Sequence, residues 1–140
     1  MRSQRAQTLQ DYQLVRQLRN QVRHYMTHHR AVLSEQDQVH FFEQRHSHDL
    51  VLYYSRLESF VGYTLIQARG NRFFGSLALL EEFRGKGVGT HMYRQMQQQH
   101  GSTLWLEIFS DNESSIRAAE KAQFIFHSFY DGMMTFVWEV

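Results

Sequence analysis

Gly85, Gly87 and Gly89 alternate with other residues in one short segment, and no other feature constrains the chain as much. The segment separates an apolar stretch from a helical pattern, so it predicts a junction between a strand and a helix. Glycines let the backbone turn sharply and approach a ligand closely. The first N–H groups of the helix lack partners within it and lie at the positive end of its dipole, which suits a phosphate. Arg84 and Lys86 add cations beside them.

The spacing of the glycines separates several kinds of phosphate site. A nucleotide hydrolase of the Walker type needs glycine, four residues and then Gly-Lys-Ser/Thr, which this segment lacks. A dinucleotide fingerprint needs GxGxxG in an alternating βαβ chain, whereas the segment reads GxGxG after an arginine. Two hypotheses stay open at this point. Either the segment binds a phosphate ligand of another kind than these nucleotides, or a helix merely follows a flexible turn and binds nothing.

Apolar periodicity predicts a mixed fold. Residues spaced by three and four indicate helices, and alternating residues or short apolar runs indicate strands. Ser34 and Asp37 resemble a capping box at one helix start, and Asp131-Gly132 is a strong two-residue hairpin turn. The pattern therefore predicts α/β structure of the α+β kind with a largely antiparallel sheet. The predicted helices are 9–25, 34–44, 90–100 and 112–122, and the predicted strands are 49–56, 59–69, 72–80, 103–109, 124–130 and 133–140.

Length and composition bound the class of protein. The chain has 140 residues, of which 42% are hydrophobic and 21% charged, which predicts a single domain over residues 1–140 with a substantial core. A net charge of +1 gives no basic excess for nucleic acid, and no apolar run approaches the roughly 18 residues that cross a membrane. We expect a soluble, cytoplasmic protein. The absence of cysteine excludes disulfides, thiolate metal sites and a cysteine nucleophile.

Two ordered motifs resemble a known superfamily. Arg84, Gly87 and Gly89 match the signature of the GNAT N-acetyltransferases, which is arginine or glutamine, two residues, glycine, one residue, and glycine or alanine. A second element follows at the expected distance, with a strand, then Asn112, and then residues 116–124, which are similar to the second motif of that family. The resemblance extends over the middle and the later part of the chain.

The resemblance implies both a fold and an activity. The fold would be the GNAT fold, a mixed, mostly antiparallel central sheet of about six to seven strands flanked by about four helices. The activity would be direct transfer of the acetyl group of acetyl-CoA to a primary amine, without a metal. The resemblance implies that the backbone of Leu77 and Leu79, together with Asn112, binds the pantetheine arm of the cofactor. It implies that the pyrophosphate is bound by Arg84, Gly85, Lys86, Gly87, Val88, Gly89 and Thr90.

Three positions depart from the pattern of the family. Members often have proline before the loop, tyrosine seven residues after the asparagine and glycine before the last phenylalanine, where this chain has Glu81, Ala119 and Gln123. The tyrosine would protonate the departing thiolate of CoA. A thiol with a pKa of about 8.5 can leave without an acid, so activity is still expected. The candidate substitutes for the acid are Tyr93, Tyr130 and His127.

Glu107 is the candidate catalytic base. It lies five residues before Asn112, where it resembles the proposed base of the ribosomal-protein alanine N-acetyltransferases. Strand alternation places it with Trp105 and Phe109, opposite an apolar face. An acceptor arrives as an ammonium ion and must lose a proton, and a carboxylate among aromatic rings can have the raised pKa that helps. The alternative is a surface glutamate that faces solvent or an arginine.

The acceptor is predicted from the first helix. Residues 18–26 resemble the opening of family members that acetylate amino groups on nucleotide-linked sugars. Arg16, Arg19 and Arg23 share spacings of three and four, so they form either a solvated face or part of an acceptor groove. Cations suit an anionic small molecule such as an amino-sugar nucleotide, which we rank first.

Other interpretations stay open. A protein N-terminus is the second candidate acceptor, because Ser115 and residues 120–121 resemble the ribosomal-protein group. A catalytically silent acyl-CoA-binding module would also keep the loop and lack the tyrosine. Residues 124–140 could pair with a second copy through an exposed strand edge, which predicts a homodimer. Two histidine pairs are interpreted as solvated side chains rather than metal ligands, namely His28 with His29 and His46 with His48.

Overall fold

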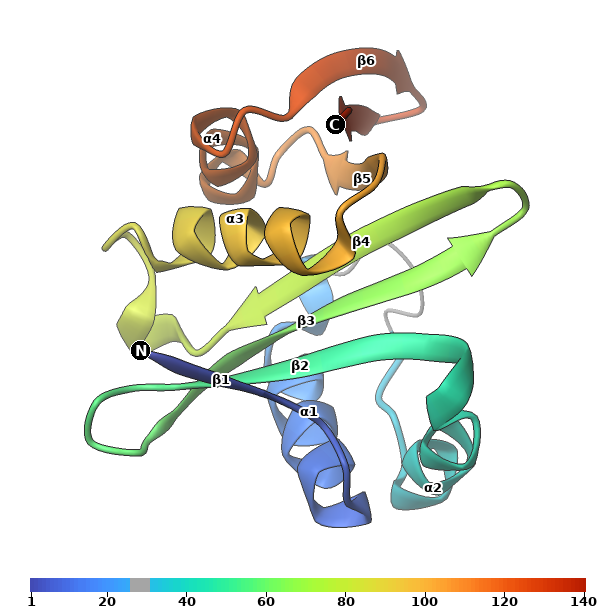
Figure 1. Cartoon of the computed structure of the whole chain (residues 1–140), viewed down its shortest axis with the longest axis vertical. Helices are drawn as coiled ribbons and strands as arrows, with labels where there is room; N and C mark the ends of the chain where they lie inside the picture. The colour runs from blue at the N-terminus through green and yellow to red at the C-terminus, as the bar shows by residue number, and fades with distance from the viewer. Residues whose placement is uncertain (26–30) are drawn as a thin grey trace.

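The computed structural model describes residues 1–25 and 31–140, which form one mixed sheet with helices on both faces (Figure 1). Within these residues the sheet has seven strands, in the order β1 (Arg2–Arg5), β2 (His48–Tyr54), β3 (Phe60–Arg69), β4 (Arg72–Leu79), β5 (Leu104–Phe109), β7 (Met133–Trp138) and β6 (Ile125–Tyr130). The α-helices are α1 (Leu9–Gln21), α2 (Glu35–Glu43), α3 (Val88–His100) and α4 (Glu113–Lys121). Neighbouring strands are antiparallel except β4 and β5, which α3 connects in parallel. The predicted α/β fold class with a mostly antiparallel sheet is confirmed.

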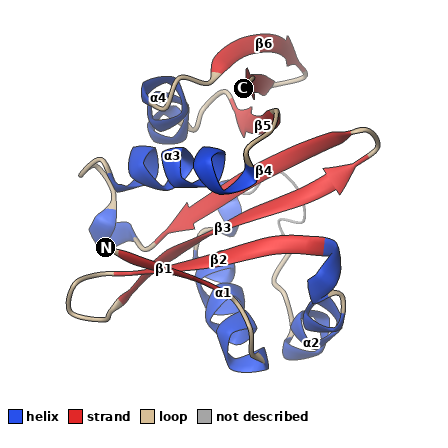
Figure 2. Ribbon diagram, in the orientation of Figure 1, coloured by secondary structure: helices blue, strands red, loops and turns tan. Residues whose placement is uncertain are grey.

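Helices α1 and α2 cover one face of the sheet, and α3 and α4 cover the other (Figure 2). Alternation along β2 divides its side chains between the two faces, because Leu50 and Leu52 pack with α1 whereas Tyr53 packs with Met92 of α3. In Figure 1, α1 passes behind β2 and β3 and α2 lies beside it, at the end of the molecule away from β5 and β6. The two faces of the sheet therefore have separate apolar clusters. Helices α1 and α2 cover the part of their face that β1–β3 form.

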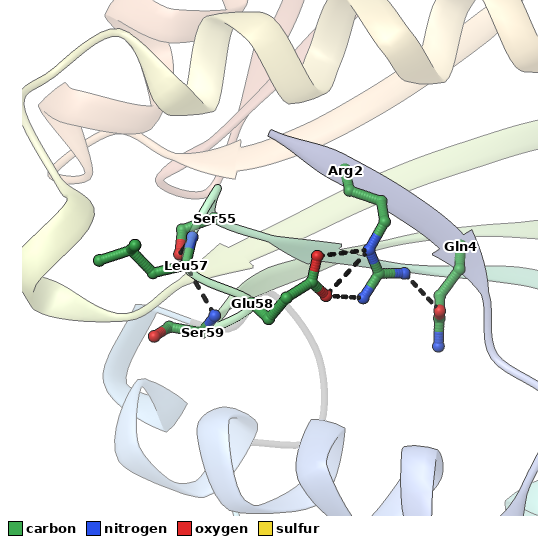
Figure 3. A network of polar contacts seen from close by, with 6 residues as sticks. All are labelled: Arg2, Gln4, Ser55, Leu57, Glu58 and Ser59. Carbon is green, nitrogen blue, oxygen red and sulfur yellow. Dashed lines mark hydrogen bonds and ion pairs between the residues drawn. The ribbon is translucent and has the colours of Figure 1, made fainter.

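Among the strands of the described residues, β1 is the one that the sequence did not predict. Its four residues are polar and exposed, so they show no apolar alternation. It forms because its backbone pairs with β2, from Arg2 opposite Tyr54 to Arg5 opposite Val51. The Arg2 guanidinium also donates to Glu58 in the β2–β3 turn, with Nη2 2.5 Å from Oε2 (Figure 3). Tertiary pairing, rather than local pattern, decides this strand.

Local signals fix the ends of several elements. Both Ser34 and Thr8 form capping boxes, at α2 and α1 respectively, of which the first was predicted. Asp131 and Gly132 have φ of +50° and +79°, as a type I′ hairpin turn requires. The first helix is shorter than predicted, since α1 ends at Gln21 and a 3₁₀ turn follows. Among the described residues, no helix combines the length and the apolar character needed to cross a membrane.

Candidate active site

Strands β4 and β5 share a single bridge within the described residues, Phe74 opposite Trp105, and they separate toward their C-terminal ends. Leu80 N–H donates to a carbonyl oxygen of β3 at 3.0 Å, so the even-numbered residues of β4 direct their backbone groups to β3. The N–H and C=O groups of Leu77 and Leu79 therefore point to the other edge of the strand. They face the opening between β4 and β5.

The glycine segment forms the predicted junction between strand and helix. Helix α3 begins at Val88, and Gly87 is its N-cap. Gly85 and Gly87 have φ of +72° and +79°, left-handed conformations that favour glycine. A glycine cap has no side chain to accept from the first amides, and the first α-helical bond runs from His91 N–H to the Gly87 oxygen at 3.2 Å. The N–H groups of residues 88–90 therefore lie at the positive end of α3, where an anion can bind.

The remaining predicted loop residues surround this helix start. Arg84 is half-buried and Lys86 is exposed, so both cations lie just before α3. Thr90 is buried in the first turn of the helix. A Cβ atom on Gly89 would lie 3.5 Å from Ala118 of α4 and 3.8 Å from Leu79 of β4. The loop, the end of β4 and α4 thus meet at one place.

A 3₁₀ turn takes the place of the proline that the family often has before the loop. Glu81 begins this turn, Glu81–Phe83, directly after β4. Phe83 N–H donates to the Leu80 oxygen and Arg84 N–H donates to the Glu81 oxygen, each at 3.0 Å. Hydrogen bonds within the turn, together with the glycines that follow it, shape this part of the chain.

Asn112 is the N-cap of α4, at the end of the loop that follows β5. Its Oδ1 atom accepts from Ser115 N–H at 3.4 Å. A side-chain oxygen that accepts from an N–H group of the first turn is the usual cap of a helix start. The cap fixes the Asn112 side chain at the start of α4, three residues after the last residue of β5.

Glu107 lies on the β5 edge of the opening, two residues beyond Trp105. Its side chain is 24% exposed and forms an ion pair with Arg69, at the end of β3. The neighbouring Leu106 and Ile108 are buried against α3 and α4, so Glu107 faces the opposite side of the sheet. The interpretation as a surface glutamate expected solvent or an arginine beside Glu107, and the structure provides the arginine. The interpretation as a catalytic base requires a carboxylate near the opening, and Glu107 lies on the strand that forms one edge of it.

A pair of hydroxyl groups lies one helical turn from Ala119. Tyr93 of α3 is buried, and its Oη atom is 3.1 Å from Ser115 Oγ of α4. Burial raises the pKa of Tyr93 to about 12, so the phenol keeps its proton at neutral pH. Tyr130, by contrast, is 84% exposed at the end of β6. His127 is exposed and packs edge-on against Trp105, with ring centroids 4.9 Å apart.

Gln123 occupies a backbone conformation that favours glycine. It follows α4 with φ of +71°, and its N–H donates to the Glu120 oxygen at 2.9 Å. A left-handed residue at this place commonly ends a helix, and glycine adopts it without a steric cost. The departure from the family's glycine therefore keeps the turn but adds strain to it.

The three arginines singled out from the sequence do not share one solvated face, because Arg16 and Arg19 belong to α1 whereas Arg23 begins the 3₁₀ turn Arg23–Tyr25 that follows it. Arg16 Nε donates to Gln13 at 2.6 Å, and its Nη2 lies 3.7 Å from a carboxylate oxygen of Glu35. Arg19 is half-buried beside Tyr63 of β3, and burial lowers the pKa of Arg19. The solvated-face interpretation is therefore wrong for Arg19, which packs toward the sheet.

The histidine interpretation also needs a correction. His46 is exposed as predicted, but His48 is 6% exposed at the start of β2 and bonds to the hydroxyl of Tyr12. It is buried because Phe41 of α2 stacks on it. His28 and His29 lie outside the described residues. In the described part of the chain, no group of three or more acidic or histidine side chains could hold a metal ion.

A recess of about 300 Å³ lies elsewhere on the sheet, and the candidate site residues do not line it. It is formed by β1–β3 and by the end of α3, and the Arg5–Asp49 ion pair, 2.6 Å long, lies at it. The recess is therefore separate from the opening between β4 and β5.

Two arginines near Glu107 were not singled out from the sequence. Arg69 and Arg72 flank the turn between β3 and β4 and lie opposite each other. Their guanidinium groups stack on Phe74 and Trp105, respectively. Alternation within the hairpin could have placed the two arginines on one face. That β5, with Trp105 and Glu107, lies beside this hairpin is known only from the tertiary structure.

Comparison with known proteins completes this description. The model of the acetyltransferase (GNAT) family matches residues 14–124. No curated protein matches the chain. Similar solved structures include a GNAT superfamily phosphinothricin acetyltransferase from Sinorhizobium meliloti in complex with acetyl-CoA, with 16% identity, a TM-score of 0.84 and coverage of 99% of this chain and 88% of that one.

Two further similar structures are acetyltransferases with other names. A ribosomal-protein-alanine N-acetyltransferase from Brucella melitensis has 13% identity and a TM-score of 0.84 over 100% of both chains. A spermidine N-acetyltransferase from Vibrio cholerae has 9% identity and a TM-score of 0.80, covering 99% of this chain and 95% of that one. These similarities confirm the fold, and the family model spans most of the chain. The chain therefore belongs to the acetyltransferase (GNAT) family and is an acyltransferase.

Proposed function

We propose that this protein transfers the acetyl group of acetyl-CoA directly to a primary amine. The observation that carries the proposal is the opening between β4 and β5, which ends at the N-terminus of α3. The N–H groups of residues 88–90, with Arg84 and Lys86, suit a pyrophosphate. The backbone of Leu77 and Leu79 offers donors and acceptors to a pantetheine arm along the same opening. Asn112, the cap of the helix that follows β5, is the proposed contact from the other strand.

Glu107 is the proposed base. An ammonium ion that reaches the opening gives one proton to the Glu107 carboxylate, directly or through a water molecule. The amine nitrogen then forms a bond to the thioester carbon, the carbon–sulfur bond breaks, and the sulfur leaves with the electron pair as a thiolate. Backbone N–H groups on the β4 edge are the candidates to stabilise the negative oxygen that develops during the attack. The nitrogen loses its second proton as the amide forms, and this proton balances the one that the sulfur takes up when CoA is released as a thiol.

The Tyr93–Ser115 pair is the proposed proton donor to the sulfur. The pair lies one helical turn from Ala119 and close to the Asn112 cap. A phenol that keeps its proton at neutral pH can donate it through the Ser115 hydroxyl. Because a thiolate is a good leaving group, this donor would assist the reaction without being indispensable.

An anionic small molecule that carries an amine remains the proposed acceptor, with an amino-sugar nucleotide as the example. Arginine side chains on α1 and at the β3–β4 turn support an anion. The names of the similar structures include a phosphinothricin, a ribosomal-protein-alanine and a spermidine acetyltransferase, so the fold by itself does not select the acceptor. A protein N-terminus is the second candidate, and a catalytically silent acyl-CoA-binding module is the third interpretation.

We also propose that two copies of the protein form a homodimer through their β6 strands. This edge strand exposes four large side chains, of which Tyr130 is 84% and Ile125 70% exposed. An exposed apolar edge favours pairing with another strand, and an antiparallel pair of identical edges is symmetric. A charged residue at the edge, Ile125→Lys, should convert a dimer to a monomer in light scattering coupled to gel filtration. A wild-type protein that is monomeric at micromolar concentration would refute this part.

Two measurements test the catalytic proposal. Titration calorimetry measures binding of acetyl-CoA, and a thiol assay follows release of CoA with a panel of amines that includes amino-sugar nucleotides, a peptide with an N-terminal alanine, and spermidine. Binding together with amine-dependent release supports an acetyltransferase. Binding without transfer to any amine would favour the silent module. No binding of acetyl-CoA would reject both.

A further inference from the structure

Two guanidinium groups lie on two neighbouring aromatic rings at the point where the opening begins. Arg69 stacks on Phe74 with its Cζ atom 3.7 Å from the ring centroid, and Arg72 stacks on Trp105 at 3.8 Å. The strands bring the four residues together, because Arg69 is opposite Arg72 on β3 and β4 and Phe74 is opposite Trp105 on β4 and β5. We call these four residues and Glu107 the stacked-arginine cluster.

The cluster lies on one face of the sheet. Phe74 belongs to the set of even-numbered β4 residues that includes Ala78, whose side chain packs on the α1 side. Trp105 and Glu107 alternate with Leu106, which packs on the α3 side. All the charged groups of the cluster thus lie on the α1 side of the sheet, where the side chains of Arg69 and Glu107 are 41% and 24% exposed.

The cluster holds more positive than negative charge. Glu107 forms an ion pair with Arg69. Arg72 is exposed, and within residues 1–25 and 31–140 no carboxylate forms an ion pair with it. Two guanidinium groups and one carboxylate leave an excess of one positive charge. Stacking on a ring restricts a guanidinium group before it binds, while its N–H groups, which lie in the plane of the guanidinium itself, can still donate to an anion.

From this arrangement we infer that the acceptor is a small zwitterion, in which the reacting ammonium group lies a few bonds from a carboxylate or phosphate. This inference rests on the proposed acetyl transfer and names its substrate class. The anionic group of the acceptor binds Arg72 and shares Arg69. The ammonium group takes the place of Arg69 as the partner of Glu107 and gives it a proton. Binding of the anion therefore frees the base and positions the amine in one event.

Matched pairs of acceptors isolate the contribution of the anion. Amino acids are compared with their amides, for example L-alanine with L-alaninamide, and phosphoethanolamine with ethanolamine. We expect kcat/KM to be about 10- to 100-fold higher for the anionic member of a pair, which is the range that a charge-assisted hydrogen bond supplies. In Arg72→Gln this ratio should fall to near one, mainly through a higher KM for the anionic acceptor, and Arg72→Lys should restore only part of it.

The control removes a similar arginine at the other end of the sheet. Arg2 stacks on Tyr54 at 4.5 Å and pairs with Glu58, so Arg2→Gln also removes an arginine that is stacked on an aromatic ring, together with its ion pair. This variant should keep the wild-type ratio. Equal kcat/KM for an amino acid and its amide, or a ratio that survives in Arg72→Gln, would overturn the inference while transfer to amines stands. A wild-type protein that binds acetyl-CoA and acetylates no member of the panel would overturn the proposed function and this inference with it.

Discussion

The hydroxyl group of Tyr12 lies 2.9 Å from Nε2 of His48, and this hydrogen bond joins α1 to the first residue of β2 inside the protein. The His48 ring also stacks on Phe41 of α2, with 4.0 Å between ring centroids and 6° between ring planes. Burial lowers the pKa of His48, because the imidazolium ion would lose its water. One neutral histidine therefore connects both helices of this face to the sheet.

The free energy of unfolding should decrease as the pH falls below about 6.5, the ordinary pKa of histidine. In the unfolded chain His48 takes up a proton there, whereas in the folded chain it does so only at lower pH. Stability rises with pH wherever the unfolded state binds more protons, so the contribution of His48 is present above that pH and is lost below it. Urea unfolding at pH 7.5, 6.5 and 5.5 measures this dependence.

A double variant serves as the control for the histidine prediction. His48→Phe alone leaves the Tyr12 hydroxyl buried without its partner, which should cost about 1–3 kcal/mol. Tyr12→Phe together with His48→Phe removes both polar partners, and most of that cost should disappear. The double variant should also lose less stability than the wild type between pH 7.5 and 5.5. An unchanged pH dependence in the double variant would contradict the role of His48.

Glu107→Gln should lower kcat/KM by about 10²- to 10⁴-fold, the usual contribution of a general base. The amide keeps the size of the side chain but cannot take the proton of the ammonium ion. Glu58→Gln is a matched control, because Glu58 also pairs with an arginine but lies in the β2–β3 turn. The rates are measured with the best amine of the panel over pH 6 to 9. Wild-type kcat/KM in Glu107→Gln across this range would exclude the proposed base.

The two ends of α3 allow a sharp test of the cofactor loop. Gly87 at the N-terminus and Gly101 at the C-terminus have φ of +79° and +71°, and a Cβ atom would meet nothing within 4 Å at either. Alanine at either place should cost about 1–2 kcal/mol of stability through backbone strain. Only Gly87→Ala should also weaken acetyl-CoA binding, by about tenfold or more, which corresponds to about 1.4 kcal/mol. Calorimetric titration compares the two variants, and equal affinities would contradict the predicted anion site.

Tyr93→Phe tests the hydroxyl pair. The variant should lose about 1 kcal/mol of stability, the usual contribution of one hydrogen bond. If Tyr93 donates a proton through Ser115, kcat should also fall, and it should fall least with a thioester whose thiol is more acidic than CoA. Ser115→Ala should show the same dependence. A loss of stability without a change in kcat for either variant would reduce the pair to a structural contact between α3 and α4.

Gln123→Gly should stabilise the protein by about 1 kcal/mol, because glycine adopts the left-handed conformation of this position without the steric cost of a Cβ atom. Gln123→Ala is the control, since alanine keeps the Cβ atom and should give little or no stabilisation. Thermal and urea unfolding compare the three proteins. A stabilisation that is equal in both variants would assign the effect to the lost glutamine side chain instead of the backbone.

Features that depend on a few neighbouring residues could be predicted from the sequence. The glycine segment, the capping box at Ser34 and the turn at Asp131-Gly132 each need only a local pattern, and the structure contains all three elements. The alternation of β5 also placed Glu107 on the face opposite Leu106. The cofactor-binding residues implied by the family resemblance are also local, because their motifs are short segments, each where a strand is followed by a helix.

Features that depend on strand neighbours required the tertiary structure. β1 is polar and exposed, so only its pairing with β2 makes it a strand. No local signal shows that β7 lies between β5 and β6, or that His48 is covered by Phe41. Alternation alone determines which residues share a face of one strand, but not which strand lies beside it.

The candidate site divides in the same way. By itself the sequence determined the type of fold, the loop that suits a phosphate and the face of the strand that carries Glu107, because helix starts, turns and alternation are local properties. Only the tertiary structure decided that Arg69 is the partner of Glu107 and that Arg72 stacks on Trp105. These contacts join residues that are more than 30 positions apart in the chain. Their geometry follows from the register of neighbouring strands, which forms only when the whole sheet does.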